Sequence, residues 1–205
     1  MGVIPIEYLP PKDYLPDKIY PLTEVRLPKK LNLGKLFLDK HINEGRGSKV
    51  ALRYGDRKIT FLELQKEVNR FANALRGIGI EKNDRVMLRS PNRPEFVIAT
   101  FACWKIGAIP VLVHHLLKAE EIAFRANDTE AKAILVSSDT FSEVEKATPL
   151  FYQECQVIVF GERIKGHPFY EDFIRNEPDG IRMEDTTKND WGRIIYSSGT
   201  TGRPK

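Results

Sequence analysis

The sequence predicts an α/β protein in which a mostly parallel sheet is flanked by helices. From residue 85 onward, short apolar segments alternate with longer segments whose apolar residues recur every three or four positions. The short segments are apolar throughout, as expected of strands that are covered on both faces. Alternation of this kind is typical of parallel strands joined by right-handed crossovers. With 205 residues the chain can form one domain with a substantial core, but hardly two.

The N-terminal part of the chain is less regular. Residues 1–30 are rich in proline and show no periodicity, which predicts an extended arm that packs over a larger body. A helix is expected over residues 30–44. Its apolar side would comprise Leu33, Phe37 and Ile42. Residues 50–61 hold two short strand candidates around Gly55-Asp56, which is a hairpin signal.

The clearest helix begins after Thr60. Thr60 and Glu63 match a capping box, in which each side chain accepts a hydrogen bond from the other residue's free backbone N–H. Gly77 and Gly79 supply the stop. The apolar residues between them recur at three and four: Phe61, Leu64, Val68, Phe71, Leu75 and Ile78.

Strands and helices then alternate. Strands are predicted over residues 85–89, 109–113, 133–136, 157–160 and 193–196. Helices are predicted from Asn92 onward and over residues 119–127, 142–151 and 169–175. Asn92 is expected to be the N-cap of the first of these helices, with Pro94 in its first turn. The aromatic residues of this first helix are interpreted as part of the core and not as the lining of a substrate pocket: Phe96, Phe101 and Trp104.

Composition and charge exclude several classes of protein. Thirty-two Lys and Arg against twenty-eight Asp and Glu give a net charge of +4, spread along the chain. A strip that binds nucleic acid would be denser and interleaved with aromatic residues, so no nucleic acid is expected as a partner. The most hydrophobic stretch, residues 96–113, is interrupted by Lys105 and Pro110 and is too broken to span a bilayer.

The two cysteines indicate a reducing compartment. Cys103 and Cys155 are far apart and lie in no pattern that suits zinc, so no metal site is expected from them. Cys103 is interpreted as a small core residue. The N-terminus lacks the cationic start and apolar run of a secretory signal. A cytoplasmic location is therefore expected.

The residues that carry chemistry close the sequence, in IIYSSGTTGRPK, residues 194–205. A buried strand runs here into a loop in which glycines allow positive φ and a close approach to a ligand. Consecutive backbone N–H groups in such a turn form a concave nest for anionic oxygens. Hydroxyl donors and a mobile lysine charge add to it. The candidate phosphate-binding residues are Ser197, Ser198, Gly199, Thr200, Thr201, Gly202 and Lys205.

This loop could also be interpreted as a Walker loop or as a plain polar turn. The Walker loop needs GxxxxGK followed by Ser or Thr at the start of a helix, whereas Gly202 is followed here by Arg-Pro-Lys. A polar turn between strands is the simpler alternative for a cluster of Ser, Thr and Gly. The lysine at its offset and the segments upstream favour a phosphate loop over a plain turn.

The spacing of residues 194–205 resembles the phosphate loop of the adenylate-forming (AMP-binding) superfamily, which includes acyl- and aryl-CoA synthetases. Upstream, the segments ITFLELQKEVNRFANAL, GIEKNDRVMLRSPNRPEF, FACWKIGAIPVL and EEIAFRANDTEAKAILV also resemble that family in order and spacing. The segments LPKKLN and LRSPNRPEF look most like the benzoate and 2-aminobenzoate CoA-ligase branch. The resemblance covers essentially residues 30–205 and implies that a partial N-terminal AMP-binding domain over residues 31–205 follows the proline-rich arm of residues 1–30.

The resemblance also implies an activity. Family members join a carboxylic acid, of fatty or aromatic type, to coenzyme A, using ATP and Mg²⁺ and passing through an acyl-adenylate. The family's catalytic lysine, its magnesium ligand and most of its acyl pocket should lie beyond Lys205. No catalytic residue and no metal ligand is therefore expected within these 205 residues, which alone are expected to be inactive.

Alternatives stay open at this point. The chain could be a non-enzymatic fragment that binds a nucleotide or a partner, or it could belong to an enzyme that loads a carrier protein instead of CoA. An NTPase of another class is disfavoured because the Walker lysine is absent. A homodimer is left open, since the hydrophobic edge and faces of a partial sheet favour association.

Three further pairs of residues have simple structural interpretations. His114-His115 is expected in a strand, where the two side chains point to opposite faces and cannot easily share one metal ion. One of them could still lie near a ligand at the sheet edge. Asp190-Trp191 is expected in a turn, and Glu120-Glu121 in a solvated first turn of a helix.

Overall fold

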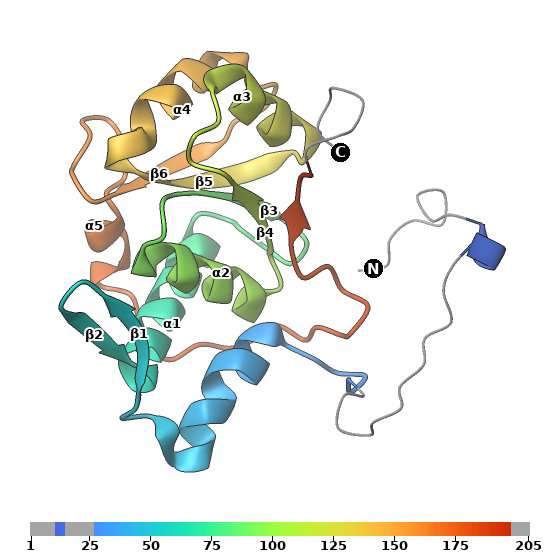
Figure 1. The fold of residues 1–205 in the computed structure, drawn as a ribbon, viewed down its shortest axis with the longest axis vertical. Coiled ribbons are helices and arrows are strands. Elements are labelled where there is room, and N and C mark those ends of the chain that lie inside the picture. The colour runs from blue at the N-terminus through green and yellow to red at the C-terminus, as the bar shows by residue number, and fades with distance from the viewer. Residues whose placement is uncertain (1–10, 15–26, 198–205) are drawn as a thin grey trace.

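The computed structural model describes residues 11–14 and 27–197 (Figure 1). Most of the predicted arm therefore lies outside the described residues, as do residues 198–205. Lys12–Tyr14 forms a short 3₁₀ turn. At the arm's end, Lys30 forms an isolated antiparallel bridge with Thr187.

A five-stranded parallel sheet forms the centre of the fold, in the order β6-β5-β3-β4-β7. This confirms the predicted α/β class with a parallel sheet and flanking helices (Figure 1). The strands are β3 (Arg85–Arg89), β4 (Ile109–Val113), β5 (Ala131–Ser137), β6 (Gln156–Phe160) and β7 (Ile194–Ile195). A separate antiparallel hairpin consists of β1 (Val50–Tyr54) and β2 (Arg57–Thr60), as predicted around Gly55-Asp56.

Helices cover both faces of the sheet. They are α1 (Phe61–Gly77), α2 (Pro94–Ile106), α3 (Ala119–Asp128), α4 (Phe141–Ala147) and α5 (Tyr170–Arg175). Helices α1, α2 and α5 share one core with Val86 and Leu88 of β3. Helices α3 and α4 share the other core with Met87. Because successive side chains of a strand point to opposite faces, β3 contributes to both cores, and its three central residues are all apolar.

Helix α1 forms as its sequence predicts. Thr60 Oγ1 accepts a hydrogen bond from the N–H of Glu63 at 3.2 Å, and Glu63 Oε2 accepts one from the N–H of Thr60 at 2.8 Å. The capping box is thus confirmed. Four of the six predicted apolar residues are fully buried: Leu64, Val68, Phe71 and Leu75.

Two predictions about helices are wrong in detail. The helix expected over residues 30–44 contains two wide-turn π segments, η4 (Lys35–Asp39) and η5 (Ile42–Arg46). Their i→i+5 bonds shift the buried face, so Leu38 is fully buried while Phe37 is 49% exposed. The N-cap of α2 is Arg93 and not Asn92, because Pro94 occupies the first helical position.

The apolar side of α2 also differs from the expectation. Its fully buried residues are small or aliphatic: Ile98, Ala99, Ala102, Cys103 and Ile106. Phe96 and Phe101 are half-buried and pack against the core, as interpreted, while Trp104 stacks against Phe101 with ring centroids 5.3 Å apart. The interpretation of Cys103 as a core residue is confirmed, and burial raises the pKa of its thiol.

The other helices and strands differ from their predicted bounds by only a few residues. One of these differences has a clear physical cause. The helix expected over residues 142–151 ends at Ala147, and a 3₁₀ turn, η7 (Thr148–Leu150), follows. Pro149 lacks the N–H that a continued α-helix would need.

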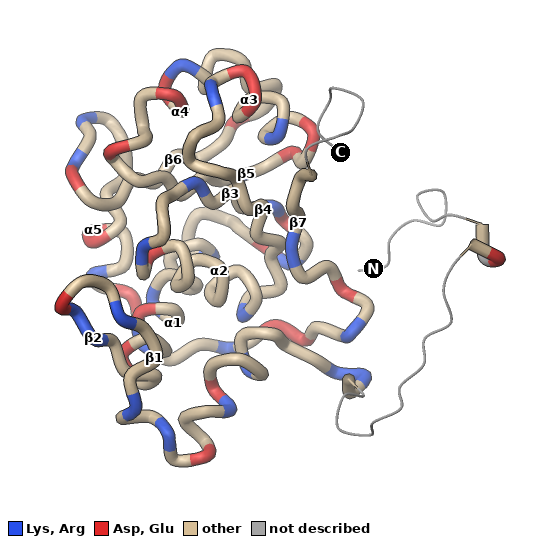
Figure 2. The backbone as a smooth tube through the Cα atoms, in the orientation of Figure 1, with Lys and Arg blue, Asp and Glu red and all other residues tan. Residues whose placement is uncertain are grey.

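In the described part of the chain, no helix has both the length and the apolar character to cross a bilayer. Basic and acidic residues are interspersed over the body (Figure 2).

A buried ion pair joins the wide-turn helix to α1 and α2. Lys105 Nζ donates to Asp39 Oδ1 and to Asn69 Oδ1, both at 2.7 Å. Gln65 Nε2 also donates to Asp39 Oδ1, at 2.6 Å. Lys105 is 1% exposed and Asp39 7%. Each charge thus has a partner within the core, which its burial requires.

The hydroxyl of Tyr170 offers a test of the core around α5. It is buried and has no hydrogen-bond partner among the described residues. Burial, followed by the nearby carboxylate of Glu67, raises the pKa of Tyr170 well above its ordinary value. Because an unpaired buried hydroxyl only costs desolvation, Tyr170→Phe is expected to leave the free energy of unfolding unchanged or raise it by about 1 kcal/mol. Urea unfolding measures this, and a clear loss of stability would contradict it.

Candidate phosphate-binding site

The carboxyl ends of all five strands meet at one edge of the sheet. In open α/β sheets, ligands usually bind at this edge. The segments that follow the strands begin here, at Ser90, His114, Ser138, Gly161 and Tyr196. Because β7 lies next to β4, the carboxyl ends of these two strands are neighbours at this edge.

Strand β7 enters the candidate loop. Ile194 and Ile195 pair with Val111 and Leu112 of β4 in parallel register. Ser197, the first candidate phosphate residue, is exposed two residues beyond β7. The other candidates lie outside the described residues: Ser198, Gly199, Thr200, Thr201, Gly202 and Lys205. The structure therefore gives the position of the loop's entrance.

A long irregular segment, residues 177–193, connects α5 to β7, and we call it the strap. Its first part is held by side chains of α1. Asn69 Nδ2 donates to the carbonyl of Asp179 at 2.7 Å, and Asn73 Nδ2 donates to the carbonyls of Pro178 and Gly180, both at 2.9 Å. Backbone carbonyls outside a sheet need such donors, so these amides fix a segment that has no strand partner.

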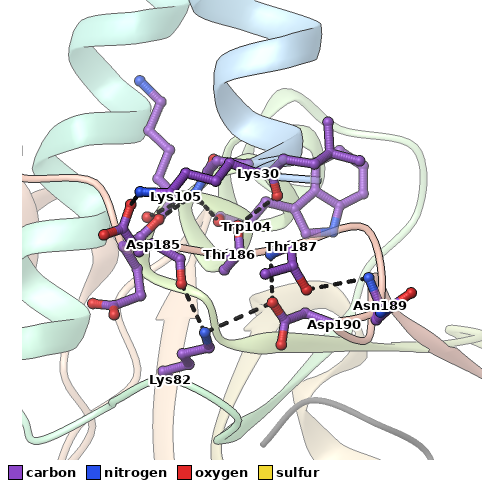
Figure 3. Close-up of polar contacts among 12 residues, drawn as sticks. Lys30, Lys82, Trp104, Lys105, Asp185, Thr186, Thr187, Asn189 and Asp190 are labelled. Atoms are coloured by element: carbon purple, nitrogen blue, oxygen red, sulfur yellow. Dashed lines mark hydrogen bonds and ion pairs between the residues drawn. The ribbon is translucent and has the colours of Figure 1, made fainter. Parts of the chain in front are cut away.

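The second part of the strap ends in a tight turn before β7 (Figure 3). Asp190 Oδ2 accepts a hydrogen bond from the N–H of Thr187 at 2.5 Å and lies 3.7 Å from Lys82 Nζ. Trp104 Nε1 donates to the carbonyl of Gly192 at 2.5 Å. The predicted turn at Asp190 is confirmed. These contacts fix the direction in which the chain enters β7.

Tyr196 secures the chain directly after β7. Its hydroxyl donates to a carboxylate oxygen of Asp128, at the end of α3. The guanidinium of Arg125 lies 5.0 Å from the centre of its ring, in cation–π geometry. Burial and the hydrogen bond to Asp128 raise the pKa of Tyr196. Nothing near Tyr196 in the sequence predicts this anchor, because Asp128 lies 68 positions upstream.

Arg89 is a second residue of this edge that sequence reasoning missed. It ends β3 and is only 1% exposed. Its guanidinium donates to the carbonyls of Thr140 at 2.5 Å, His115 at 2.6 Å and Leu117 at 2.9 Å. Burial lowers the pKa of Arg89, while the carboxylates of Glu143 and Asp139 partly offset this.

The two histidines differ from the prediction. Strand β4 ends at Val113, so His114 and His115 lie in a turn and do not alternate across a strand. Their rings stack with centroids 4.7 Å apart. His114 Nδ1 accepts a hydrogen bond from the N–H of Leu116 at 3.2 Å. Within the described ranges, no group of three His, Cys, Asp or Glu side chains could hold a metal ion.

Glu120 and Glu121 lie in the first turn of α3 and are exposed, as predicted. Glu121 Oε2 accepts a hydrogen bond from the N–H of Lys118 at 3.1 Å, which caps the helix. A negative charge here also complements the helix dipole. The pair is thus part of the helix and lies outside the chemistry of the edge.

Comparisons with known proteins agree with this geometry. The sequence pattern of the AMP-binding enzyme family matches residues 38–205. An acetyl-coenzyme A synthetase of Methanothrix thermoacetophila is 33% identical over 199 residues, covering 86% of this chain and 30% of the relative. A 3-hydroxybenzoate–CoA/4-hydroxybenzoate–CoA ligase of Thauera aromatica is 27% identical over 177 residues, covering 85% of this chain and 34% of the relative.

Two solved structures share the fold. The anthranilate CoA ligase AuaEII, in complex with anthranoyl-AMP, superposes with a TM-score of 0.83 at 30% identity, covering 87% of this chain and 34% of that chain. A benzoate CoA ligase from Burkholderia xenovorans LB400 superposes with a TM-score of 0.74 at 24% identity, covering 85% of this chain and 33% of that chain, and shows the fold alone. The chain spans about a third of the length of the curated relatives it matches.

Proposed function

We propose, because this chain belongs to the family of AMP-binding enzymes, that the whole protein is an ATP-dependent carboxylate–CoA ligase and that residues 194–205 hold the phosphates of ATP. One observation carries this proposal. Strand β7 ends at the carboxyl edge of a parallel sheet, where ligands bind in such folds, and the SSGTTGRPK segment follows β7 in the sequence. We further propose an arm over residues 1–30 and a partial AMP-binding domain over residues 31–205.

The proposed reaction has two steps. A carboxylate oxygen of the acid attacks the α-phosphorus of ATP, the bond to the β-phosphate oxygen breaks, and pyrophosphate leaves. The thiol of coenzyme A then attacks the acyl carbon, and AMP leaves as the thioester forms. The loop's role is to hold the β- and γ-phosphates in line and to stabilise the charge of the leaving group with donors already in place.

Each residue of the loop has a proposed part in this task. By their position in the motif, Thr200 and Thr201 are the proposed hydroxyl donors, and Lys205 supplies a point charge at the far end. Gly199 and Gly202 let the backbone approach the phosphates. Magnesium would accompany the ATP phosphates, but the described residues offer no cluster of ligands for the ion.

An aromatic acid is the proposed substrate class. The solved ligase of 30% identity carries anthranoyl-AMP, and a relative of 27% identity acts on hydroxybenzoates by its name. Other relatives are acetyl-coenzyme A synthetases, so acetate is the alternative to test. We also propose a cytoplasmic location, since both cysteines are free thiols, as is usual in a reducing compartment.

Pyrophosphate exchange tests the proposal directly. The full-length protein is incubated with ATP, labelled pyrophosphate and one acid from a panel of benzoate, 2-aminobenzoate, 3-hydroxybenzoate, acetate and hexanoate. Exchange is expected with at least one aromatic acid, and coenzyme A should then be consumed. Residues 1–205 alone are expected to show no exchange. Absence of exchange with every acid would overturn the proposed activity, and exchange without consumption of coenzyme A would favour a carrier protein as acceptor.

A further inference from the structure

Arg89 is placed unusually for a residue of the central strand. The strand is otherwise apolar at its centre, and the Arg89 side chain is buried at its carboxyl end. Its three hydrogen bonds all go to backbone carbonyls, and no carboxylate of the described residues lies within ion-pair distance of it. Burying a cation costs free energy when its direct partners are carbonyl groups and the carboxylates of Glu143 and Asp139 act only from a distance. We therefore attribute the role of Arg89 to the backbone segments that its planar guanidinium, with its fork of N–H donors, holds together.

The guanidinium holds two loops in place. One is the histidine turn, which we define as residues 114–117, where it binds the carbonyls of His115 and Leu117. The other follows β5, where it binds the carbonyl of Thr140. Because C=O and the next N–H of a planar peptide point in opposite directions, the N–H groups of residues 116 and 118 point away from Arg89. They donate to His114 Nδ1 and Glu121 Oε2, so these peptides are held from both sides.

The histidine turn stands beside the entrance of the candidate phosphate loop. Leu112 of β4 pairs with Ile195 of β7. His114 and Ser197 follow two residues further along the two chains, beyond the ends of β4 and β7. The turn presents the exposed side chains of His114 and Leu116 at this edge. It is therefore placed to form the wall of the site next to the loop.

We infer that Arg89 is a positioning residue of the proposed ligase, which fixes the histidine turn as a wall for ATP and the acid. The expected effect on the KM for ATP rests on the proposed function. The expected effect on the mobility of the histidine turn rests only on the hydrogen bonds of Arg89 and does not depend on activity. Loss of the fork frees three carbonyls, so the turn should loosen while the sheet beneath it stays paired.

Arg85 provides a matched control on the same strand. It begins β3 at the opposite edge and likewise clamps backbone carbonyls, those of Asn83 at 3.1 Å and Glu130 at 3.3 Å. Arg85→Met should lower stability as Arg89→Met does, but it acts far from the carboxyl edge. A general loss of stability therefore affects both variants, and an effect on the site affects only one.

The experiment compares Arg89→Met, Arg89→Lys and Arg85→Met in the full-length protein. In pyrophosphate exchange, Arg89→Met is expected to raise the KM for ATP about tenfold or more, Arg89→Lys to restore part of this, and Arg85→Met to leave it unchanged. In hydrogen exchange, the amides of residues 116–119 should exchange at least tenfold faster in Arg89→Met than in the wild type, with α1 unchanged. This second readout needs no activity, so it separates the inference from the proposed function.

The outcomes are distinct. No exchange of pyrophosphate by the wild-type protein would sink the proposed function, and hydrogen exchange would then still decide whether Arg89 holds the turn. An active wild type with an unchanged KM and unchanged amide exchange in Arg89→Met would overturn the inference. If Arg89→Met does not fold, Arg89→Lys decides, since it keeps the charge but loses the fork. A fully normal KM and normal amide exchange in Arg89→Lys would then show that the fork is not needed.

Discussion

Replacing Thr200 and Thr201 together by valine is expected to lower kcat for acyl-adenylate formation by about a hundredfold to a thousandfold. The proposed loop stabilises the charge that develops on the leaving pyrophosphate, and losing one such preorganised donor costs on the order of 10²–10³ in kcat. Valine keeps the shape of threonine and removes only the hydroxyl. Pyrophosphate exchange by the full-length variant, at saturating ATP and acid, measures the effect.

Thr100→Val is the matched control for this double variant. Thr100 lies within α2, and its hydroxyl donates to the carbonyl of Phe96 at 2.8 Å. The same chemical change is thus made away from the carboxyl edge, and wild-type exchange is expected. A folded Thr200→Val/Thr201→Val protein with wild-type kcat would show that these hydroxyls do not serve the leaving group.

The second large effect concerns stability. Asp39→Ala is expected to lower the free energy of unfolding by about 3–5 kcal/mol, because it leaves Lys105 as a buried charge without its carboxylate. Replacing both members, in Asp39→Leu/Lys105→Met, is expected to recover much of this loss, since no buried charge remains. Urea unfolding of the three proteins at neutral pH makes the comparison, and a loss below 1 kcal/mol in Asp39→Ala would contradict the prediction.

The loss should also depend on pH. Burial lowers the pKa of Lys105, while the hydrogen bond and charge of Asp39 raise it. Without Asp39, only the lowering by burial remains, so the pKa of Lys105 is lower in the folded protein than in the unfolded chain. Between these two pKa values, the unfolded chain binds more protons than the folded protein. Stability then rises with pH in this range. The deficit of Asp39→Ala is therefore expected to shrink as the pH rises towards the ordinary pKa of lysine, about 10.4.

The sequence predicts the local features of this fold well. Strands β3 and β4 have the predicted bounds, because each is a short apolar run between clear turn signals. The start of α1 follows from Thr60 and Glu63, which are three residues apart and interact directly. Such features depend on neighbours in sequence, and a single sequence contains those neighbours.

The features that the sequence did not predict depend on residues that are distant in sequence. Leu38, and not Phe37, is buried because the wide-turn helix packs against α1, and helical spacing alone does not reveal a π turn. The contacts of Arg89 cross 26 to 51 positions of sequence, so nothing near Arg89 announces them. For the candidate site, the sequence indicates the loop and its chemistry, whereas the proposed wall beside it depends on the pairing of β4 with β7.

The way the strap is held has a consequence for how its sequence can change. Its anchors are side chains on α1, α2 and the turn at Lys82, and they bind backbone carbonyls of the strap such as those of Asp179 and Arg182. A backbone carbonyl is present whatever side chain its residue carries. Exposed positions of the strap should thus accept many amino acids, whereas Asn69 and Asn73 should accept few. The route of the chain into β7 is thus encoded in side chains that lie 88 to 110 positions before the carbonyls they hold.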